Sequence, residues 1–205
     1  MAQPLIALVT ATGAWETDQD ALVLVRALAD VGIVGEPVIW DAPEVDWSIF
    51  DAAVMRSPWD YIDRPREFLA RLEVIQRVTP VYNPVELLRW NSDKHYLADL
   101  AEAQVPVIPT SFVSELGFSA SDLFPNHGGF VVKPTISSGS RNTAKYSQDQ
   151  RDLAAAHVTD LLNASQTVMV QPYIDSVEQV GETGLVFFGG EFSHGFCKAA
   201  LLTQG

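Results

Sequence analysis

Short apolar runs and helical patterns alternate through the first 85 residues, and this alternation limits the possible folds most strongly. The run LIALV (residues 5–9) is continuous and bounded by turn residues, as expected of a strand covered on both faces. PVIW, AAVM and VYN predict three further strands. Strands and helices in alternation favour a parallel sheet with helices on both faces. The sequence therefore predicts a doubly wound α/β unit.

Two helices are expected between these strands. The first covers about residues 18–31, with Asp18 as its cap. Its inward face is expected to carry Leu22, Val25 and Ala29. The second, PREFLARLEVIQRV, has apolar residues at i, i+4 and i+7, which is the spacing of one helix face. These residues are Phe68, Leu72 and Ile75.

The pattern changes near residue 108. NSDKHYLADLAEAQ predicts a helix that starts at Ser92 or Asp93, and the prolines of VPVIPT end it. FVVKPT, AKYS and TVMVQPY then predict strands, and DQRDLAAAHVTDLLN predicts an amphipathic helix. Gly189 and Gly190 between two β-rich runs predict a hairpin. Helices beside an antiparallel sheet indicate a second, α+β domain.

The net charge of −13 disfavours nucleic acid and anionic membranes as partners, because both attract clustered positive charge. An anionic ligand would need a local site that works against this charge. No apolar run approaches the roughly 20 residues that span a bilayer, and the N-terminus lacks the features of a secretory signal. Cys197 is the single cysteine, so we expect a cytoplasmic protein and a buried structural thiol rather than a nucleophile.

The segment GFVVKPTISSGSRNT suggests an anion site. Lys133 ends a β-branched strand, and the loop that follows is rich in hydroxyl residues around Gly139. Backbone N–H groups and hydroxyls in such a loop can surround an anion, and a lysine beneath them suits a polyphosphate. The alternative is a flexible serine-rich turn with the Lys133 ammonium in solvent.

Common sequence fingerprints are absent. The sequence has no G-x-x-x-x-G-K-[ST] and no G-x-G-x-x-G, so P-loop and dinucleotide-binding Rossmann proteins are disfavoured. C-x-x-C, H-E-x-x-H and G-x-S-x-G are also missing, and the four histidines lack ligand spacing.

The order of the segments carries more information. A lysine opens a helix that leads to VPVIPT, and then come the lysine-bearing strand, the serine loop, a helix and VMVQPYID. This series resembles the ATP-grasp superfamily of carboxylate-activating ligases. FDAAVMRSPWDY, NPVELLRWNSDKHYL and SVEQVGETGLVFF are similar to its branch that forms D-cycloserine, which is related more distantly to glutathione synthetase and D-alanine–D-alanine ligase.

The resemblance covers essentially the whole chain and implies an α/β fold. Residues 1–108 would form a Rossmann-like (pre-ATP-grasp) substrate domain with a linker helix. An α+β ATP-grasp domain would follow, with its small lid subdomain at residues 109–172 and the start of its large subdomain at residues 173–205. The C-terminal part of the ATP-grasp domain is expected beyond this sequence.

The resemblance also implies an ATP site. The expected phosphate contacts are Lys94, Lys133, Ser137, Ser138, Gly139 and Ser140, and Lys133 could also approach the adenine. The strand expected to border adenine consists of Gln171, Pro172, Tyr173 and Ile174. Glu182 or Glu178 would bind the ribose hydroxyls, and Lys198 would point toward the phosphates. The residues assigned to catalysis are Lys133, Lys198, Ser138 and Ser140.

A substrate site is expected in RSPWDY, which follows a parallel strand at the sheet edge where α/β proteins bind ligands. Arg56 could bind a substrate carboxylate with two hydrogen bonds, and Asp60 could hold an ammonium group. Trp59 would contact the substrate, although packing at a domain interface is an open alternative for it. Ser57 and Thr10 belong to the same edge.

The implied activity is that of an ATP-grasp carbon–nitrogen ligase that uses ATP and Mg²⁺ and activates a small amino acid carboxylate as an acyl phosphate. In the D-cycloserine branch, which serves antibiotic biosynthesis, a nitrogen of the same molecule would close a ring. No E-x-N pair occurs, so magnesium ligands are expected beyond residue 205. An intermolecular amino acid or peptide ligase, a non-catalytic nucleotide-binding module and an α/β scaffold without nucleotide stay open, as does homodimerisation.

Overall fold

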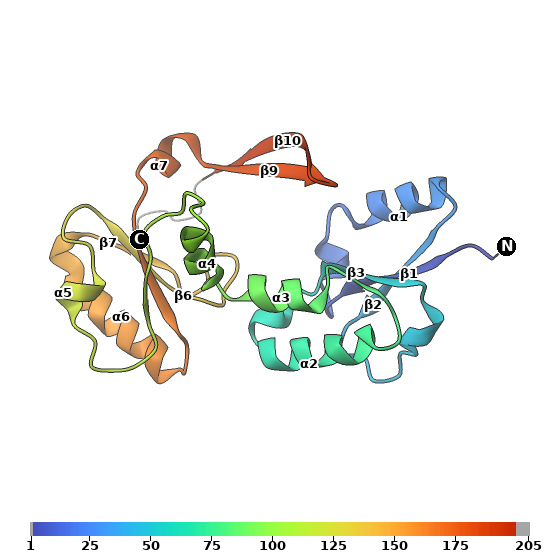
Figure 1. The fold of residues 1–205 in the computed structure, drawn as a ribbon, viewed down its shortest axis with the longest axis horizontal. Helices are drawn as coiled ribbons and strands as arrows, with labels where there is room; N and C mark the ends of the chain where they lie inside the picture. Colours follow the sequence, from blue (N-terminus) through green and yellow to red (C-terminus); the bar gives the residue numbers. More distant parts are fainter. Residues whose placement is uncertain (1, 200–205) are drawn as a thin grey trace. The chain divides into compact units, whose positions relative to one another are not determined.

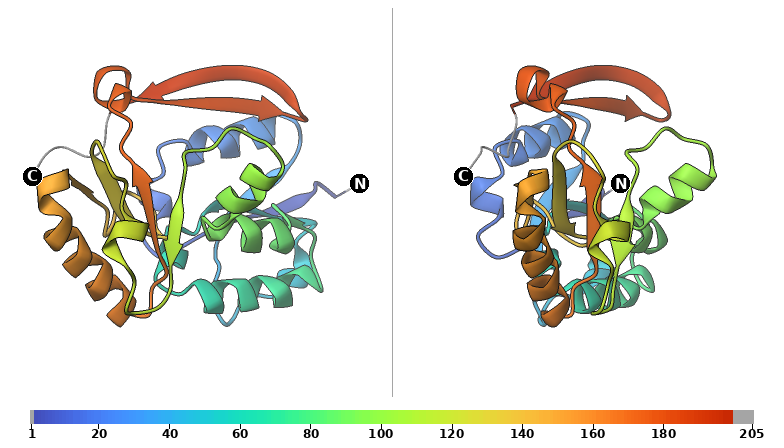
Figure 2. Two further views of the ribbon diagram at one scale, coloured as in Figure 1. Left: turned by 60° about the vertical axis from the view of Figure 1, so that its left-hand side comes forward. Right: turned by 90° about the vertical axis from the view of Figure 1, so that its left-hand side faces the viewer.

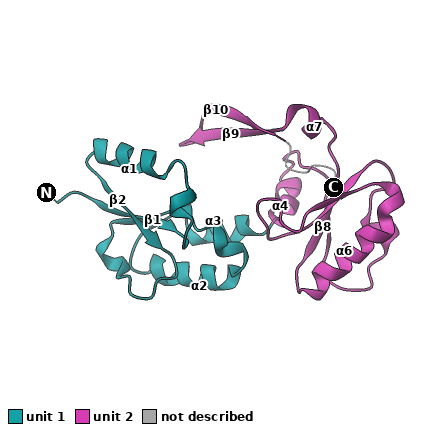
Figure 3. Ribbon diagram, turned by 180° about the vertical axis from the view of Figure 1, so that it is seen from behind, with its two compact units in different colours: residues 1–93 teal, residues 94–205 magenta. Residues whose placement is uncertain are grey.

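The computed structural model describes residues 2–199 and divides into two compact units (Figures 1 and 3). Unit 1 comprises residues 1–93 and unit 2 comprises residues 94–205. The expected boundaries at residues 108 and 172 stay predictions, and residues 200–205 of the expected large subdomain lie outside the described range. Within that range, every helix is too short or too polar to cross a bilayer.

Unit 1 contains a parallel four-stranded sheet, which confirms the predicted α/β arrangement. Its strands lie in the order β2-β1-β3-β4. They are β1 (Leu5–Thr10), β2 (Val34–Ile39), β3 (Ala52–Ser57) and β4 (Val81–Tyr82). Helices α1 (Ala21–Asp30) and α2 (Pro65–Gln76) lie on opposite faces of the sheet, and α3 (Val85–Ser92) packs beside α2 (Figure 1). Short 3₁₀ helices are η1 (Trp15–Thr17), η2 (Trp47–Ile49) and η3 (Trp59–Ile62).

The core of unit 1 forms where the central strand meets α2. Residues 7–9 of β1 are buried on both faces of the sheet, as a strand with two neighbours and two covering layers requires. The predicted helix face is buried as well, because Phe68, Leu72 and Ile75 are each at most 3% exposed. Removal of one such aliphatic side chain costs about 2–5 kcal/mol, so this face fixes α2 on the sheet.

Two helix starts differ from the sequence predictions. Asp18 does not cap α1: its Oδ1 is bound by Arg56, and the helix begins at Ala21 without a side-chain cap. Leu22 and Ala29 are exposed, so the expected inward face of α1 is wrong at these two residues. The third expected helix begins at Tyr96 as α4 (Tyr96–Glu102), because α3 already ends at Ser92.

Unit 2 contains an antiparallel four-stranded sheet in the order β5-β8-β6-β7. The strands are β5 (Ser111–Val113), β6 (Phe130–Pro134), β7 (Ala144–Tyr146) and β8 (Val168–Pro172). The 3₁₀ helix η4 (Gln148–Gln150) leads into α6 (Arg151–Asn163), which packs on one face of the sheet (Figure 2), and α5 (Ala120–Leu123) adds to the same core. Because side chains alternate along a strand, Phe130 and Val132 face α6, whereas Val131 and Lys133 face the other side.

A hairpin follows the sheet. After α7 (Ser176–Val180), β9 (Glu182–Phe188) and β10 (Glu191–Lys198) pair around the predicted turn at Gly189 and Gly190. Gly181 starts the hairpin at φ +72°, and a Cβ there would lie 2.0 Å from the Lys198 carbonyl oxygen, so this position requires glycine.

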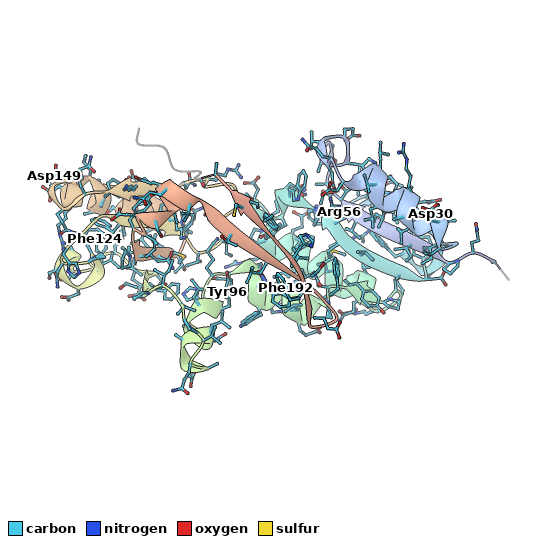
Figure 4. The ribbon with its side chains drawn as sticks, turned by 90° about the horizontal axis from the view of Figure 1, so that it is seen from above. Asp30, Arg56, Tyr96, Phe124, Asp149 and Phe192 are labelled. Carbon is cyan, nitrogen blue, oxygen red and sulfur yellow. The ribbon has the colours of Figure 1, made fainter. Side chains whose placement is uncertain are left out.

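The hairpin extends from α7 away from the four-stranded sheet of its unit (Figure 2). Its large apolar side chains are exposed, including Phe192, which Figure 4 labels. Cys197 is exposed too, so the expected buried thiol is wrong. A two-stranded sheet can bury a thiol only where another layer covers it, and the described residues place no such layer over Cys197.

Candidate functional site

A cleft of about 300 Å³ lies on the face of the unit 2 sheet that is opposite α6. Residues from the start of α4, the serine loop, two central strands and the start of β9 line it. The predicted ATP-site residues that it brings together are Lys94, Lys133, Ser137, Ser138, Gly139, Ser140, Gln171, Pro172, Tyr173, Ile174 and Glu182. Segments almost 90 residues apart in the sequence therefore meet at one cavity.

Lys133 is the least compensated cation of the cleft. Within residues 2–199, its ammonium group makes no hydrogen bond or ion pair. Burial lowers the pKa of Lys133, and the nearby Glu182 carboxylate acts in the opposite direction. A cation that has lost water and gained no close partner favours the arrival of an anion.

Lys94 is bound to the loop that covers the cleft. Its Nζ donates to the carbonyl oxygens of Thr135 (3.2 Å) and Ser137 (2.8 Å) and lies 3.2 Å from the Ser137 hydroxyl. Its backbone N–H also donates to the Thr135 carbonyl oxygen, at 3.0 Å. These contacts attach the start of α4 to the beginning of the serine loop, so Lys94 holds this loop beside the cleft.

The serine loop consists of tight turns. Gly139, Ser140 and Asn142 have φ angles of 60°, 60° and 53°, in the left-handed region. The N–H of Arg141 donates to the Ser138 carbonyl, and that of Thr143 donates to the Ser140 carbonyl. Left-handed residues among turns curve successive backbone N–H groups toward one side, which is the geometry of an anion-binding concavity.

The strand expected to border adenine lies at the other side of the cleft. Gln171 is buried, and its Nε2 donates to the Thr110 hydroxyl at 2.8 Å, so this amide nitrogen is engaged inside the protein. The N–H of Tyr173 donates to the Gly129 carbonyl at 2.8 Å. These bonds fix residues 171–173 as a continuation of β8 along the cleft.

The two acidic candidates for ribose occupy different places. Glu182 lines the cleft. Glu178 instead forms an ion pair with Lys145, with 2.6 Å between Oε1 and Nζ. The geometry therefore favours Glu182. Lys198 pairs in register with Glu182, but its ammonium lies 5.4 Å from the Phe196 ring centroid, and among the described residues it does not line the cleft.

The substrate-site candidates lie at the carboxyl ends of β1 and β3 in unit 1. Thr10 and Ser57 are buried, and their hydroxyls are 2.9 Å apart. Arg56, labelled in Figure 4, binds the Asp18 carboxylate, whose side chain is only 3% exposed. The Arg56 side chain is 29% exposed, although its Nε is buried.

Asp60 belongs to a second polar group at this edge. Its Oδ1 accepts a hydrogen bond from the Trp40 indole (2.8 Å), and its Oδ2 is 2.7 Å from Nη2 of Arg64. Both carboxylate oxygens thus have partners within unit 1. Trp59 is half exposed, with 50% of its surface accessible.

Comparison with known proteins assigns the chain to a family. Residues 6–83 match the family described as D-cycloserine synthetase DcsG, N-terminal domain. The chain is 42% identical over 204 residues to the cycloserine biosynthesis protein DcsG of Streptomyces lavendulae, which covers 97% of this chain and 68% of that protein. The chain belongs to the D-cycloserine synthetase family of ATP-grasp ligases.

Solved structures agree with this assignment. The crystal structure of D-cycloserine synthetase DcsG superposes with a TM-score of 0.88 at 42% identity, over 96% of this chain and 68% of that one. A RimK-domain ATP-grasp protein from Sphaerobacter thermophilus (TM-score 0.61, 21% identity, 83% and 64% covered) shares the fold. So does D-alanyl-alanine synthetase A from Vibrio cholerae (TM-score 0.67, 15% identity, 94% and 65% covered).

ATP-grasp ligases imply Mg²⁺, and the described residues do not supply a site for it. In residues 2–199, no three or more His, Cys, Asp or Glu side chains gather in a group that could hold a metal ion. Glu182 is the acidic side chain of the predicted set that lines the cleft, and one carboxylate is not a ligand set.

Sequence reasoning missed three contacts that shape these sites. Asp18 was assigned to a helix end because aspartate before an apolar run is typical of a cap, whereas its partner Arg56 lies 38 residues further on. Thr110 and Lys145 received no role. Lys145 could have been noticed, because the strand AKYS returns directly from the serine loop and must bring its lysine near the cleft.

Proposed function

We propose that this protein phosphorylates a small amino acid carboxylate with ATP and couples the resulting acyl phosphate to a nitrogen nucleophile. The observation that supports this most is the convergence of Lys94, Lys133 and the serine loop on one cleft in a chain with a net charge of −13. Such a chain repels anions in general, so a buried cation beside a donor-rich loop indicates a specific polyphosphate site.

In this proposal the cleft binds ATP along its length. Residues 171–174 border the adenine, and the Glu182 carboxylate accepts hydrogen bonds from the ribose hydroxyls. The serine loop, with Ser138 and Ser140, surrounds the terminal phosphates. Lys133 stabilises the negative charge on the transferring phosphoryl group, and catalysis comes mainly from positioning and electrostatics.

A substrate carboxylate oxygen attacks the γ-phosphorus, the bond to the β-phosphate oxygen breaks, and ADP leaves. The nitrogen then attacks the acyl carbon, gives up a proton to solvent, and expels inorganic phosphate. The first step converts the carboxylate oxygen, a poor leaving group, into part of a phosphate that leaves readily in the second step, which is the reason for activating a carboxylate in this way.

The 42% identity to DcsG supports a nucleophile within the same molecule, so that the second step closes a ring as in D-cycloserine formation. O-ureido-D-serine is the substrate that this implies. Its carboxylate and ammonium groups would meet the exposed part of Arg56 and the polar edge formed by Thr10, Ser57, Trp59 and Asp60 in unit 1.

The test is a coupled assay for ADP with mass spectrometry of the product. Full-length protein is mixed with ATP, Mg²⁺ and either O-ureido-D-serine, its L-enantiomer or ordinary amino acids. We expect ADP release and a cyclised product with the D-compound and no second amine. If ADP is released only when a second amine is added, the result rejects ring closure and supports intermolecular ligation. Absence of both ATP binding and ADP release would reject the ligase.

A further inference from the structure

Lys145 and Glu178 form a contact group with Tyr173, and the proposed function uses only Tyr173 of the three. Lys145 Nζ is 2.6 Å from Glu178 Oε1, and it lies 3.6 Å from the centroid of the Tyr173 ring. The ammonium group therefore makes an ion pair and a cation–π contact at the same time. Cation–π contacts with Tyr stabilise by about 0.5–1 kcal/mol at exposed sites.

The three residues belong to segments that enter and leave the cleft. Lys145 lies on β7, two residues after Thr143 of the serine loop, and Thr143 lines the cleft. Glu178 lies on α7, which follows the strand that borders the expected adenine position. Tyr173 itself lines the cleft, whereas in the described residues Lys145 and Glu178 do not.

The backbone beneath this group is closely packed. Tyr173 donates its N–H to the Gly129 carbonyl at the start of β6. A Cβ on Gly129 would lie 3.5 Å from the Tyr173 Cβ and 3.6 Å from the Lys145 Cε, so the two side chains meet directly above this glycine. Lys145 thus reaches across the end of β6 to hold the Tyr173 ring.

The charges keep the contact formed over a wide pH range. The hydrogen bond to Glu178 raises the pKa of Lys145, and the same hydrogen bond lowers the pKa of Glu178. Both groups are therefore ionised from mildly acidic to mildly alkaline pH. The Lys145 side chain is 21% exposed and that of Glu178 is 44% exposed, which places the pair at the rim of the unit rather than in its core.

We infer that Lys145 and Glu178 are positioning residues that hold Tyr173, and with it residues 171–174, in the shape that receives the adenine ring. This inference rests on the proposed function of the cleft. Because the pair acts through Tyr173 and at the end of the cleft away from Lys133, it sets nucleotide affinity and leaves the rate of phosphoryl transfer almost unchanged. It also predicts which variants should couple.

The experiment measures ATP binding by calorimetry, together with KM for ATP and kcat, in the full-length protein. Lys145→Met removes the ion pair and the cation–π contact, and we expect roughly tenfold weaker ATP binding. Glu178→Gln removes the ion pair and leaves the cation–π contact, and we expect roughly threefold weaker binding. The double variant should resemble Lys145→Met alone, because Glu178 has lost its partner there. In each case KM for ATP rises and kcat stays within about twofold, since only ground-state binding changes.

Two further variants separate positioning from other effects. Lys145→Arg keeps a cation over the ring and a partner for Glu178, so it should restore most of the affinity. Glu115→Gln removes a charge from an exposed residue elsewhere in unit 2 and should change nothing.

Unchanged affinity in Lys145→Met, additive losses in the double variant, or a large fall in kcat at constant KM would each overturn the inference while the unaltered protein still binds ATP. Failure of the unaltered protein to bind ATP is a different result: it rejects the proposed function, and the role of the pair with it.

Discussion

The polar groups of the two units are arranged in opposite ways. At the carboxyl edge of the unit 1 sheet, charges are paired with one another: Arg56 binds one oxygen of Asp18, although Asp18 Oδ2 and Arg56 Nε make no hydrogen bond within the described residues, and Asp60 is held by Trp40 and Arg64. In the cleft of unit 2, the Lys133 ammonium is withdrawn from water and, within residues 2–199, has no hydrogen-bond partner. Charges that are paired within one unit support its fold, whereas an uncompensated cation favours a ligand.

The difference explains why similar residue types should respond differently to substitution. Removal of a cation from unit 1 leaves a buried carboxylate without a partner and so affects stability first. Removal of Lys133 from the cleft leaves no hydrogen-bond partner behind and so affects nucleotide binding first.

Lys133→Met should have the largest effect. We expect about 10²–10³-fold lower kcat/KM for ATP, the usual loss when one preorganised donor to a transferring group is removed. The thermal unfolding midpoint should stay the same or rise, because burial of the charged group is no longer required. The measurements are ADP release and thermal unfolding. Arg66→Met, which removes an exposed cation of α2, is the matched control. Activity within tenfold of the unaltered protein would contradict the assigned role of Lys133.

Arg56→Met should mainly destabilise unit 1. The Asp18 side chain is 3% exposed, and loss of one partner of a buried pair costs 3–5 kcal/mol, which we reduce to about 2–3 kcal/mol because Arg56 is partly exposed. All five tryptophans lie in unit 1, so their fluorescence during urea unfolding reports on this unit alone.

The double variant Asp18→Asn, Arg56→Met distinguishes the effect of losing the ion pair from the effect of losing the other contacts of Arg56. It should recover part of the lost stability, since the buried charge is gone. An Arg56→Met protein as stable as the unaltered one would show that the pair is not structural.

Lys94→Met should loosen the serine loop. Three contacts from Nζ to residues 135 and 137 disappear, and we expect roughly tenfold faster trypsin cleavage after Arg141, since loss of charged hydrogen bonds lowers the free energy of local opening. The cleavage product is identified by mass spectrometry without nucleotide present. Lys94→Arg, which retains donors, should be cleaved at an intermediate rate. An unchanged rate would mean that Lys94 does not hold the loop.

The smallest effect is a pH dependence of unit 2. Burial lowers the pKa of His157, with Asp160 acting against it, and His157 Nδ1 lies 3.0 Å from the Tyr146 hydroxyl. The folded state prefers the neutral His157 ring. The neutral ring therefore contributes stability above the unfolded-state pKa of 6.5, and this contribution is lost as pH falls toward the lower pKa of the folded state. Between pH 7.5 and 5.5, unfolding followed by circular dichroism should shift slightly more than in His157→Gln. If unfolding of the unaltered protein and of His157→Gln shifts equally between these pH values, the predicted role of His157 is wrong.

The parts of the fold that follow from local periodicity could be predicted from the sequence. The burial of Phe68, Leu72 and Ile75 follows from their spacing, and the turn at residues 189–190 follows from its glycines. Helix α3 was not found in this way, because it spans only eight residues, of which Val85 is fully buried and Leu88 is partly buried, so its apolar stripe is short. Local patterns predict elements whose burial is periodic, and they fail where burial is slight.

The candidate site also has features that could be predicted from the sequence and features that could not. The resemblance to ATP-grasp ligases implied that Lys94, Lys133 and Glu182 would contact one nucleotide, and the structure brings all three to one cleft. Pairings that depend on distant partners could not be read from the sequence, such as Asp18 with Arg56 and Lys145 with Glu178. The exposure of Cys197 is a third example, since it depends on what covers a hairpin and not on the residues around the thiol.

Strand β6 builds the hydrophobic core with one set of side chains and the cleft with the alternate set. Deletion of a single residue before Lys133 would therefore exchange the two sets, sending an ammonium group into the packed layer and a valine into the cavity. Neither defect could be repaired by substitution at one position. This short stretch should consequently tolerate changes of residue type far better than changes of length.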